Sequence, residues 1–407
     1  MTDTTDAPFV VVSGTCDTKS DELVYLRDLI RAAGVAVKLV DVAPRGSSGA
    51  ADVTTRDVLA ALPGAAEELA ATADRGQAVA IVARAFVAWV DAQAPRILGM
   101  IGAGGSGNTA LITPGMGRLP VGTPKIMIST VASGDVAPYV GPNDIAMLYS
   151  VVDLAGLNSI SRRVLGNAAN MMAGAVTRPL PDAVIPEKPA LGLTMFGVTT
   201  PCIEQVVARL EADYECFVFH ATGTGGRTME KLADSGRLAG MIDVTTTEVA
   251  DLLMGGVMSA GEDRLGAAIR TRLPYVGSCG ALDMVNFGGL ETVPARYRDR
   301  QLHVHNAQVT LMRTTPEEND RMGRWIGERL NRMEGEVRFL LPLGGVSVID
   351  VPGAPFHDPE ADAALFAALR ETVRQTDRRR LIDLPHAVND PAFAEAVVAA
   401  FLDIAGR

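Results

Sequence analysis

Short apolar runs and segments of helical periodicity alternate along the first forty residues. Residues 9–14 (FVVVSG) form a mostly apolar run, which predicts a buried strand. A polar turn at 15–19 follows, and apolar residues then recur at helical spacing until Gly34, before a second apolar run begins at Val35. This order of strand, helix and strand predicts half of a doubly wound α/β sheet.

A glycine-rich segment follows the next apolar run. Residues 46–90 predict an insertion-like helical region, and the run that begins at Ile97 then leads into GAGGSGNT. Gly102, Gly104 and Gly107 satisfy the pattern G-x-G-x-x-G between a predicted strand and a predicted helix. Such a loop can present backbone amides to an anion, so we predict a phosphate or other anion site. A tight turn without a ligand is the alternative.

The same pattern of strand, Gly/Thr turn and helix starts again from Pro189. This internal repeat predicts an α/β fold of two Rossmann-like domains with mainly parallel sheets and a ligand cleft between them. We expect domains at residues 1–178 and 189–407, joined by a proline-rich linker at about 176–190. The matched segments are LGLTMFG with PFVVVSG, CFVFHATGTGGRTMEKL with ILGMIGAGGSGNTAL, and GMIDVTTTEVADLLMGG with KIMISTVASGDVAPYVG.

Composition and charge restrict the class of protein. Of the 407 residues 48% are hydrophobic and 5% aromatic, which favours a tightly packed α/β protein over a β-sandwich. A net charge of −11 disfavours a nucleic-acid or anionic-membrane partner, and the basic run at 377–383 is expected to be a solvated helix end. The N-terminus lacks a signal-peptide pattern and no apolar stretch predicts a membrane span, so we expect a cytoplasmic protein.

The four cysteines are scattered along the chain. Cys16, Cys202, Cys216 and Cys279 form no C-x-x-C motif, which argues against a disulfide framework and against a structural zinc site. Three of them are expected to be buried, whereas the polar turn around Cys16 allows an exposed thiolate.

Two further turns in the first half are candidate parts of a nucleotide site. Lys19 is placed to meet a phosphate and Asp17 to hold Mg²⁺ or a ribose, although a capped helix with a surface lysine is the alternative. The turn at 133–135 offers another anion nest. No acidic residue follows the glycine loop at the spacing that ribose binding requires, and no P-loop motif is present. The predicted nucleotide-binding residues are Gly14, Thr15, Asp17, Thr18, Lys19, Gly102, Gly104, Gly105, Ser106, Gly107, Asn108, Ser133, Gly134 and Asp135.

The second glycine loop, HATGTGGRT, adds candidate substrate-binding residues. Arg227 can bind a carboxylate or phosphate in a bidentate manner, and Glu248 follows the next predicted strand as Asp135 does in the first half. The predicted substrate-binding residues are Gly225, Gly226, Arg227, Thr228, Glu248 and Arg313.

The candidate catalytic residues are Lys19, Asp283 and His305. His303 and His305 share a face of a predicted strand, as zinc ligands do, but no third ligand stands at a suitable spacing. Asp283 and His305, with Arg313, are candidate acid–base and anion-binding groups, although satisfied polar residues at strand ends are the alternative.

Six segments form a combination that is more specific than either glycine loop. They are GTCDTKSDELVYLR, GAGGSGNTA, STVASGDVAPYVGPNDIAMLYSVVDLAGLNSISR, GALDMVNFG, HNAQVTLMRTTPEE and GGVSVIDVPGAPFHDPEAD. Together they resemble the Tm-one-like ATP-binding family, from about Pro8 to the C-terminus. The resemblance implies two Rossmann-like domains, ATP binding with Mg²⁺ and a homodimer, but no reaction. The positions within the matching nucleotide motifs are Gly14, Thr15, Asp17, Lys19, Gly104, Gly105, Ser106, Gly107 and Asn108.

Three functional hypotheses follow. The first is a cytoplasmic enzyme that uses ATP and Mg²⁺, held by Asp17, to transfer a phosphoryl or adenylyl group to a small anionic metabolite. The second is a non-catalytic nucleotide-binding regulatory module, which the lack of an unambiguous catalytic base favours. The third is an ATP-independent lyase or hydrolase of a small oxo or hydroxy acid that uses His305 and Asp283. None of them has a nucleic-acid or membrane partner.

Overall fold

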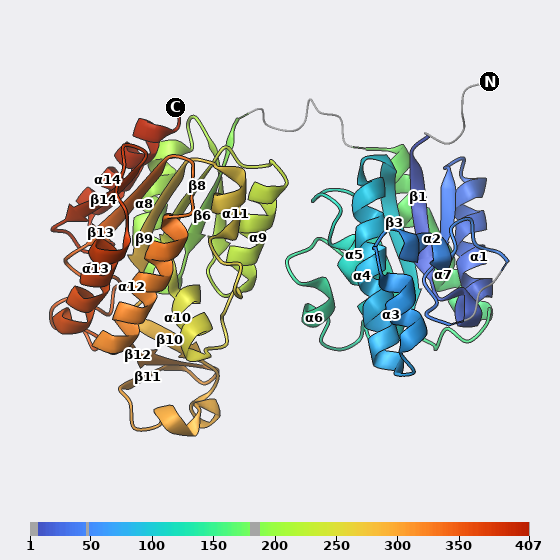
Figure 1. The fold of residues 1–407 in the computed structure, drawn as a ribbon, viewed down its shortest axis with the longest axis horizontal. Helices are drawn as coiled ribbons and strands as arrows, with labels where there is room; N and C mark the ends of the chain where they lie inside the picture. The colour runs from blue at the N-terminus through green and yellow to red at the C-terminus, as the bar shows by residue number, and fades with distance from the viewer. Residues whose placement is uncertain (1–6, 46–48, 180–187, 407) are drawn as a thin grey trace. The chain divides into compact units, whose positions relative to one another are not determined.

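The computed structural model describes residues 7–45, 49–179 and 188–406 and divides into two compact units. Unit 1 is Met1–Val184 and unit 2 is Ile185–Arg407 (Figure 1). Most of the predicted linker, residues 180–187, lies outside the described residues. Each unit is therefore described by itself.

Unit 1 is a five-stranded parallel sheet with helices on both faces (Figure 1). In spatial order its strands are β2 (Val37–Asp41), β1 (Phe9–Gly14), β3 (Ile97–Gly104), β4 (Lys125–Ser129) and β5 (Ala146–Tyr149). Its helices are α1 (Cys16–Ala32), α2 (Thr55–Ala60), α3 (Ala65–Ala71), α4 (Arg75–Gln93), α5 (Ser106–Met116), α6 (Ala137–Val140) and α7 (Ser159–Thr177), with a 3₁₀ turn, η1 (Ala94–Arg96), after α4.

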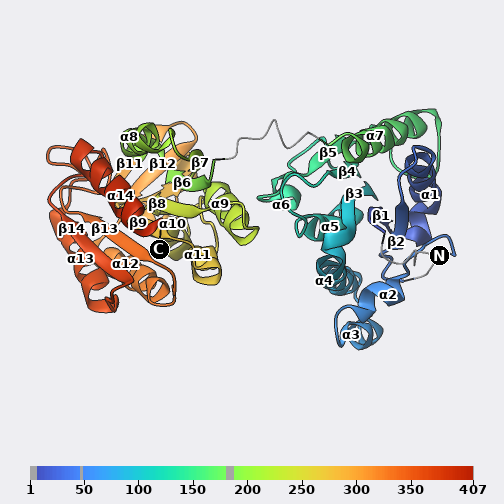
Figure 2. The same ribbon diagram turned by 90° about the horizontal axis from the view of Figure 1, so that it is seen from above.

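The apolar strands predicted from the sequence are buried on both faces. Every residue of β1 is buried, because alternate side chains enter two separate cores. One core packs the sheet against α1 and α7, and the other packs it against α4 and α5 (Figure 2). Because the strands are parallel, their carboxyl ends all lie at the same end of the sheet. The connections that follow β1 and β3 begin there.

The region at 46–90 is more regular than an insertion, although residues 46–48 lie outside the described residues. Its last helix, α4, is the crossover helix that connects β2 to the parallel strand β3. The segment Arg75–Arg96 is long and apolar enough to cross a membrane, which the sequence analysis did not predict. Its apolar side chains pack in the core of unit 1, including Phe86 and Trp89, so it serves as a core helix here.

Unit 2 contains a six-stranded parallel sheet and a smaller antiparallel sheet (Figure 1). The large sheet has the order β14 (Arg379–Leu384), β13 (Val337–Pro342), β9 (Tyr275–Gly280), β8 (Gly240–Thr245), β6 (Ala190–Met195) and β7 (Glu215–His220). The small sheet has the order β10 (Met284–Phe287), β12 (Val309–Arg313) and β11 (Leu302–Asn306). The helices are α8 (Thr200–Leu210), α9 (Thr224–Asp234), α10 (Thr247–Met254), α11 (Gly266–Thr271), α12 (Pro316–Leu330), α13 (Pro359–Thr372) and α14 (Pro391–Ile404), with 3₁₀ turns η3 (Gly197–Thr199), η4 (Leu290–Thr292) and η5 (Ala295–Tyr297).

The two large sheets share one strand order, which confirms the predicted α/β fold with two mainly parallel sheets. Numbered within its own large sheet, each begins 2-1-3-4-5, and the large sheet of unit 2 adds a sixth strand. The match of β6 with β1 agrees with this order, but the other two matched pairs were wrong by one strand. By position in the sheet β7 corresponds to β2, and β8 corresponds to β3, the strand before the first glycine loop. Similar glycine-rich composition misled the match, because strand pairing and not loop composition fixes a position in the sheet.

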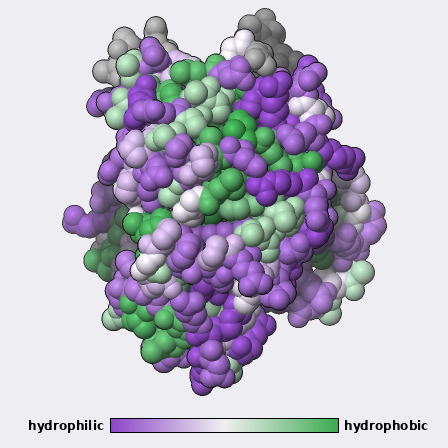
Figure 3. All heavy atoms as spheres, turned by 90° about the vertical axis from the view of Figure 1, so that its left-hand side faces the viewer, coloured by the Kyte–Doolittle hydropathy of each residue, from purple (hydrophilic) through white to green (hydrophobic). Residues whose placement is uncertain are grey.

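The basic run at 377–383 lies mainly on the edge strand β14, so the expected helix end was wrong. Arg380 and Asp383 are exposed on this edge, where charged side chains disfavour pairing with another strand. Figure 3 shows the side of unit 2 that carries α13 and α14, where hydrophobic residues lie between hydrophilic ones.

Candidate functional site

A cleft of about 650 Å³ lies in unit 1 where the turns after β1 and β3 meet. In a sheet of order 2-1-3-4-5, β1 and β3 are neighbours whose connections leave in opposite directions, and this switch point is where α/β sheets bind ligands. The cleft is lined by Thr15, Asp17, Thr18, Lys19, Pro44, Arg45, Ala73, Arg75, Ala78, Val79, Gly105, Ser106, Gly107, Asn108, Leu111 and Asp153.

The cleft brings together two turns that are about ninety residues apart in the sequence. Thr15 to Lys19 lie at the start of α1, directly after β1, and Gly105 to Asn108 lie at the start of α5, directly after β3. Gly14, Gly102 and Gly104 belong to the strands beneath the cleft. Gly14, Gly102 and Gly104 do not line it themselves, and Ser133, Gly134 and Asp135 lie apart, in an exposed turn after β4 where Asp135 accepts a hydrogen bond from the Ala137 amide (3.0 Å).

The N-terminus of α5 opens into the cleft without a side-chain cap. Its N-cap residue is Gly105, and the first helical hydrogen bond is that of the Thr109 amide to the Gly105 carbonyl (3.0 Å). The amides of Ser106, Gly107 and Asn108 therefore have no acceptor within the helix. A Cβ on Gly107 would meet no atom within 4 Å, so the space beside these amides is open. Such an arrangement, with the positive end of the helix dipole, attracts an anion.

Asn108 and Gly104 fix the shape of this loop. Gly104 has a φ of +157°, and a Cβ there would lie 2.3 Å from Nδ2 of the Asn108 side chain, so this position requires glycine. The Asn108 side chain donates to the Ala103 carbonyl (3.2 Å). Thr109 then anchors the first turn of α5 to the end of β4, because its hydroxyl shares a 2.6 Å hydrogen bond with Ser129. The amides that face the cleft are thus held by buried contacts.

The N-terminus of α1 is different, because a carboxylate of the same chain already binds it. The Cys16 amide donates to Asp41 Oδ1 (2.9 Å), which also accepts from the Ala43 amide (2.9 Å). Asp41 is buried at the end of β2. Lys19 lines the cleft while its ammonium donates to the Leu154 carbonyl. The turn after β1 therefore contributes side chains to the cleft, and the open amides come from α5.

Cys16 is buried beneath this turn, which corrects the expected exposed thiolate. Burial raises the pKa of its thiol to about 12, and the negative charge of Asp41 contributes in the same direction. The protonated thiol packs against Leu23 and Leu26 in the core beside α1, so it is not a nucleophile in this state.

The glycine loop of unit 2 is occupied by a carboxylate of its own chain. Glu248 Oε1 accepts from the amides of Gly223 (2.7 Å) and Gly226 (3.0 Å), at the start of α9. Its other oxygen accepts from Arg264, which is completely buried. Arg227 donates to the Gly223 carbonyl (3.2 Å) on the same turn. Five of the six predicted substrate-binding residues therefore lie at this loop, but two of its amides, those of Gly223 and Gly226, already have an internal acceptor. Gly225 packs against the His220 carbonyl, and the Thr228 hydroxyl donates to the Thr224 carbonyl (2.8 Å).

Of the remaining candidates of unit 2, Arg313 and Asp283 lie in one buried cluster, whereas no described contact brings His305 to them. Arg313 is buried, and its guanidinium donates to Asp350 (3.1 Å) and Asp362 (2.9 Å). Asp283 is also buried, accepts from the Ser347 hydroxyl (2.8 Å) and has its pKa raised to about 6, mainly by burial. His305, in contrast, is exposed on β11. Among the described residues no group of three or more His, Cys, Asp or Glu side chains could hold a metal.

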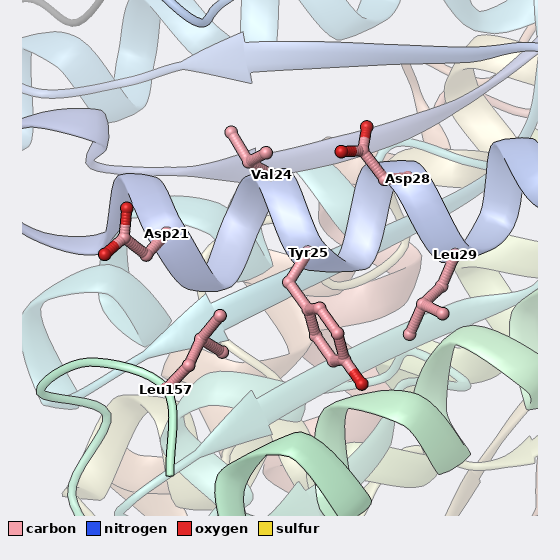
Figure 4. A pocket seen from close by; sticks show the side chains of 6 residues that line it. All are labelled: Asp21, Val24, Tyr25, Asp28, Leu29 and Leu157. Carbon is pink, nitrogen blue, oxygen red and sulfur yellow. The ribbon is translucent and has the colours of Figure 1, made fainter.

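A second hollow, of about 390 Å³, lies on the outer face of α1. Figure 4 shows Tyr25 pointing toward α7, with Leu157 beside it. Asp21 and Asp28 line this hollow and none of the described residues that line it is basic, which makes it unsuitable for an anion. The cleft at the start of α5 is therefore the candidate functional site.

Family models match both units. The model described as the N-terminal domain of the uncharacterised protein family UPF0261 matches residues 8–181, and that of the C-terminal domain matches residues 188–405. The chain belongs to the UPF0261 family. A UPF0261 protein of Rhizobium meliloti is 56% identical over 396 residues, which are 97% of this chain and 99% of that protein. A UPF0261 protein of Clostridium tetani is 43% identical and covers 97% of this chain and 98% of its own length.

The chain is also similar to tomato proteins whose name agrees with the family that the sequence resembles. The tomato ToMV resistance protein Tm-1(GCR237) is 41% identical over an alignment of 425 positions, which covers 99% of this chain but 56% of that protein. The resemblance is thus confirmed at the level of the UPF0261 family. The relatives' names state no ligand and no reaction for this family.

Sequence reasoning missed half of the cleft wall of this UPF0261 protein. Asp153 comes from the loop after β5, and Arg45 comes from the turn after β2. The loop that carries Asp153 reaches α1 because the Gly156 amide donates to Glu22 (2.7 Å). The strand order would have indicated both turns, since the ends of neighbouring parallel strands share one edge of a sheet, but the order was not predictable from the motifs.

Proposed function

We propose that unit 1 binds a nucleotide, ATP with Mg²⁺, with its phosphates at the N-terminus of α5. The observation that carries this proposal is the uncapped start of α5, which opens into a cleft of about 650 Å³ at the switch point of the sheet. This volume is within the range of small-molecule and cofactor sites. The family resemblance supports ATP in particular, because it implies an ATP-binding protein.

The charged side chains of the cleft fit a nucleotide with a divalent cation. Asp17 and Asp153 are the carboxylates that line it, and carboxylate oxygens together with phosphate oxygens are the ligands that Mg²⁺ prefers. Lys19 adds a positive charge beside Thr15 and Thr18, whose hydroxyls share a 3.0 Å hydrogen bond. The open amides of Ser106 to Asn108 would hold phosphate oxygens, while Asp17 and Asp153 would hold the cation.

The activity that we propose is phosphoryl or adenylyl transfer to a small anionic metabolite. Bound ATP supplies an activated phosphate, so the protein needs to position it and to neutralise charge rather than to provide a strong base. No histidine is among the described residues that line the cleft, which also supports a second candidate, a nucleotide-binding regulatory module. We expect the protein to act as a cytoplasmic homodimer.

A Gly105→Asp variant tests the nucleotide proposal. A Cβ on Gly105 would approach no described atom more closely than the Thr130 hydroxyl, at 3.6 Å, so the variant should fold. Its carboxylate would take the place of a phosphate and repel the nucleotide. We expect wild-type protein to bind ATP in calorimetry with Mg²⁺ and the variant to lose at least about a hundredfold in affinity, or 2.7 kcal/mol.

The matched control is Gly174→Asp on α7, where an added Cβ also meets no atom within 4 Å. This control should bind ATP as the wild type does. Equal affinity of all three proteins would place the nucleotide elsewhere, and the absence of ATP binding by folded wild-type protein would contradict the proposal.

A further inference from the structure

The part of the cleft away from the two turns is an aliphatic wall with two arginines. None of the described residues that line the cleft is aromatic, so a planar ring that enters it finds no aromatic partner. An arginine side chain can replace one, because its planar guanidinium stacks on ring faces as well as carrying charge. The residues of this wall are Pro44, Arg45, Ala73, Arg75, Ala78, Val79 and Leu111.

Arg45 is the arginine that is held in a fixed orientation. Its Nη2 atom donates to two backbone carbonyls, those of Thr72 (3.1 Å) and Ala73 (3.0 Å). These carbonyls lie in the turn before α4, which is itself fixed because Asp74 caps that helix through the Gln77 amide (2.7 Å). No corresponding pair of carbonyl bonds to Arg75 is found in the described part of the chain. A side chain that is already ordered loses less entropy when a ligand stacks on it.

Ala78, Val79 and Leu111 supply apolar contact surface, in contrast to the charged guanidinium of Arg45. Ala78 is buried and Val79 is half-buried on the first turns of α4, and Leu111 is buried on α5. These side chains offer hydrocarbon contact but no hydrogen-bonding group, so they suit the face of a heterocyclic base rather than a sugar. α5 contributes both Leu111 and the open amides, so base and phosphate would lie along one helix.

We propose that Arg45 is a specificity-determining residue that stacks on the base of the bound nucleotide, and that a purine is preferred. The proposal rests on the proposed nucleotide function of unit 1 and adds the part of the ligand that the aliphatic wall recognises. A purine presents two fused rings to the guanidinium and to the hydrocarbon side chains, and so buries more surface than a pyrimidine.

An Arg45→Lys variant tests this proposal because it keeps the positive charge and removes the planar guanidinium group. The probes are ATP, CTP and inorganic tripolyphosphate, each with Mg²⁺, titrated into the full chain by calorimetry. We expect wild-type protein to bind ATP about tenfold or more tightly than tripolyphosphate. The variant should lose most of this difference and also the preference for ATP over CTP, while its affinity for tripolyphosphate changes less than about twofold.

Arg75→Lys is the matched control, since Arg75 lines the same cleft and undergoes the same change. It should keep the difference between ATP and tripolyphosphate. Equal wild-type affinities for these two ligands, or an Arg45→Lys variant that keeps the full difference, would overturn base stacking on Arg45 while leaving the phosphate site intact. Failure of the folded wild-type protein to bind any of the three probes would instead overturn the nucleotide proposal itself.

Discussion

An Arg264→Leu substitution is expected to destabilise unit 2 by about 3–5 kcal/mol or more and to prevent its stable folding. Arg264 is completely buried and donates to three carboxylates: Asp243 (2.6 and 2.7 Å), Glu248 (2.7 Å) and Glu230 (3.2 Å). Leucine resembles the aliphatic part of the arginine side chain but carries no charge. The three carboxylates would remain buried without a cation, and burial of unpaired charge is among the largest single costs in a folded protein.

Denaturation of the full chain can measure this effect in each unit. The two tryptophans lie in different units, Trp89 on α4 and Trp325 on α12, so a Trp89→Phe background leaves Trp325 as the reporter of unit 2. The control is Arg270→Leu. Arg270 pairs with Asp234 and Asp263 at the surface, where such pairs contribute less than about 1 kcal/mol. A similar small loss for Arg264→Leu would contradict the importance of the buried network.

The stability of unit 2 is expected to decrease as the pH rises from about 4 to about 9. The fully buried Asp350 accepts from Arg313 (3.1 Å) and from the Val346 amide (2.9 Å), yet two further carboxyl groups, Asp283 and Asp362, lie close by. Burial raises the pKa of Asp350 from its ordinary 3.8 to about 9, and the negative charges of these neighbours add to the shift. The positive charge of Arg313 acts to lower the pKa of Asp350, but this guanidinium is shared between Asp350 and Asp362.

The sign of this dependence follows from proton binding. Between the unfolded pKa near 4 and the folded pKa of about 9, the folded state keeps a proton on Asp350 that the unfolded state has lost. The neutral carboxyl therefore makes its full contribution at low pH, and that contribution is lost as the pH rises toward 9. One proton corresponds to a slope of at most about 1.4 kcal/mol per pH unit.

An Asp350→Asn variant isolates this contribution, because the amide stays neutral at every pH. We expect its free energy of unfolding to depend less steeply on pH between 6 and 8 than that of the wild type, in urea denaturation followed at Trp325. Asp320→Asn is the control, since Asp320 is a surface residue of α12 that pairs with Arg324. If Asp350→Asn and the wild type have the same slope, Asp350 does not hold the proton.

The sequence was sufficient to predict the strands and loops that depend on local residue patterns. The apolar run of β1 and the glycine loop before α5 have the predicted conformations, because each depends on neighbours within a few residues. The polar turn predicted at 15–19 is shorter than expected, since α1 already begins at Cys16. Two mainly parallel sheets also followed from the repeated order of strand and helix. Even Gly105 to Asn108 and Thr15 to Lys19 were recognised separately as anion-binding turns, although only the strand order places them in one cleft.

Long-range partners were beyond what the sequence could predict. Glu248 resembles a free cleft residue by position, but Arg264 and the amides of Gly223 and Gly226 take its carboxylate. The pairing depends on how α9 and the segment before α11 pack, and no local pattern encodes that packing. Cys16 was misjudged for the same reason, since its polar sequence neighbours point away while the thiol enters the core. Arg45 could not be predicted as a site residue because it belongs to no recognisable motif. Its orientation depends on the Thr72 and Ala73 carbonyls of a different turn.

Hydrogen exchange of the full chain with and without ATP and Mg²⁺ tests the central claim most directly, because it reports on individual amides. We expect ATP to slow the exchange of the amides of Ser106, Gly107 and Asn108 at the start of α5. The amides of Gly223 and Gly226 serve as an internal control, since Glu248 already accepts from them and ATP should leave them unchanged. Protection of the unit 2 loop with none at the start of α5, or no protection at either loop, would contradict the account.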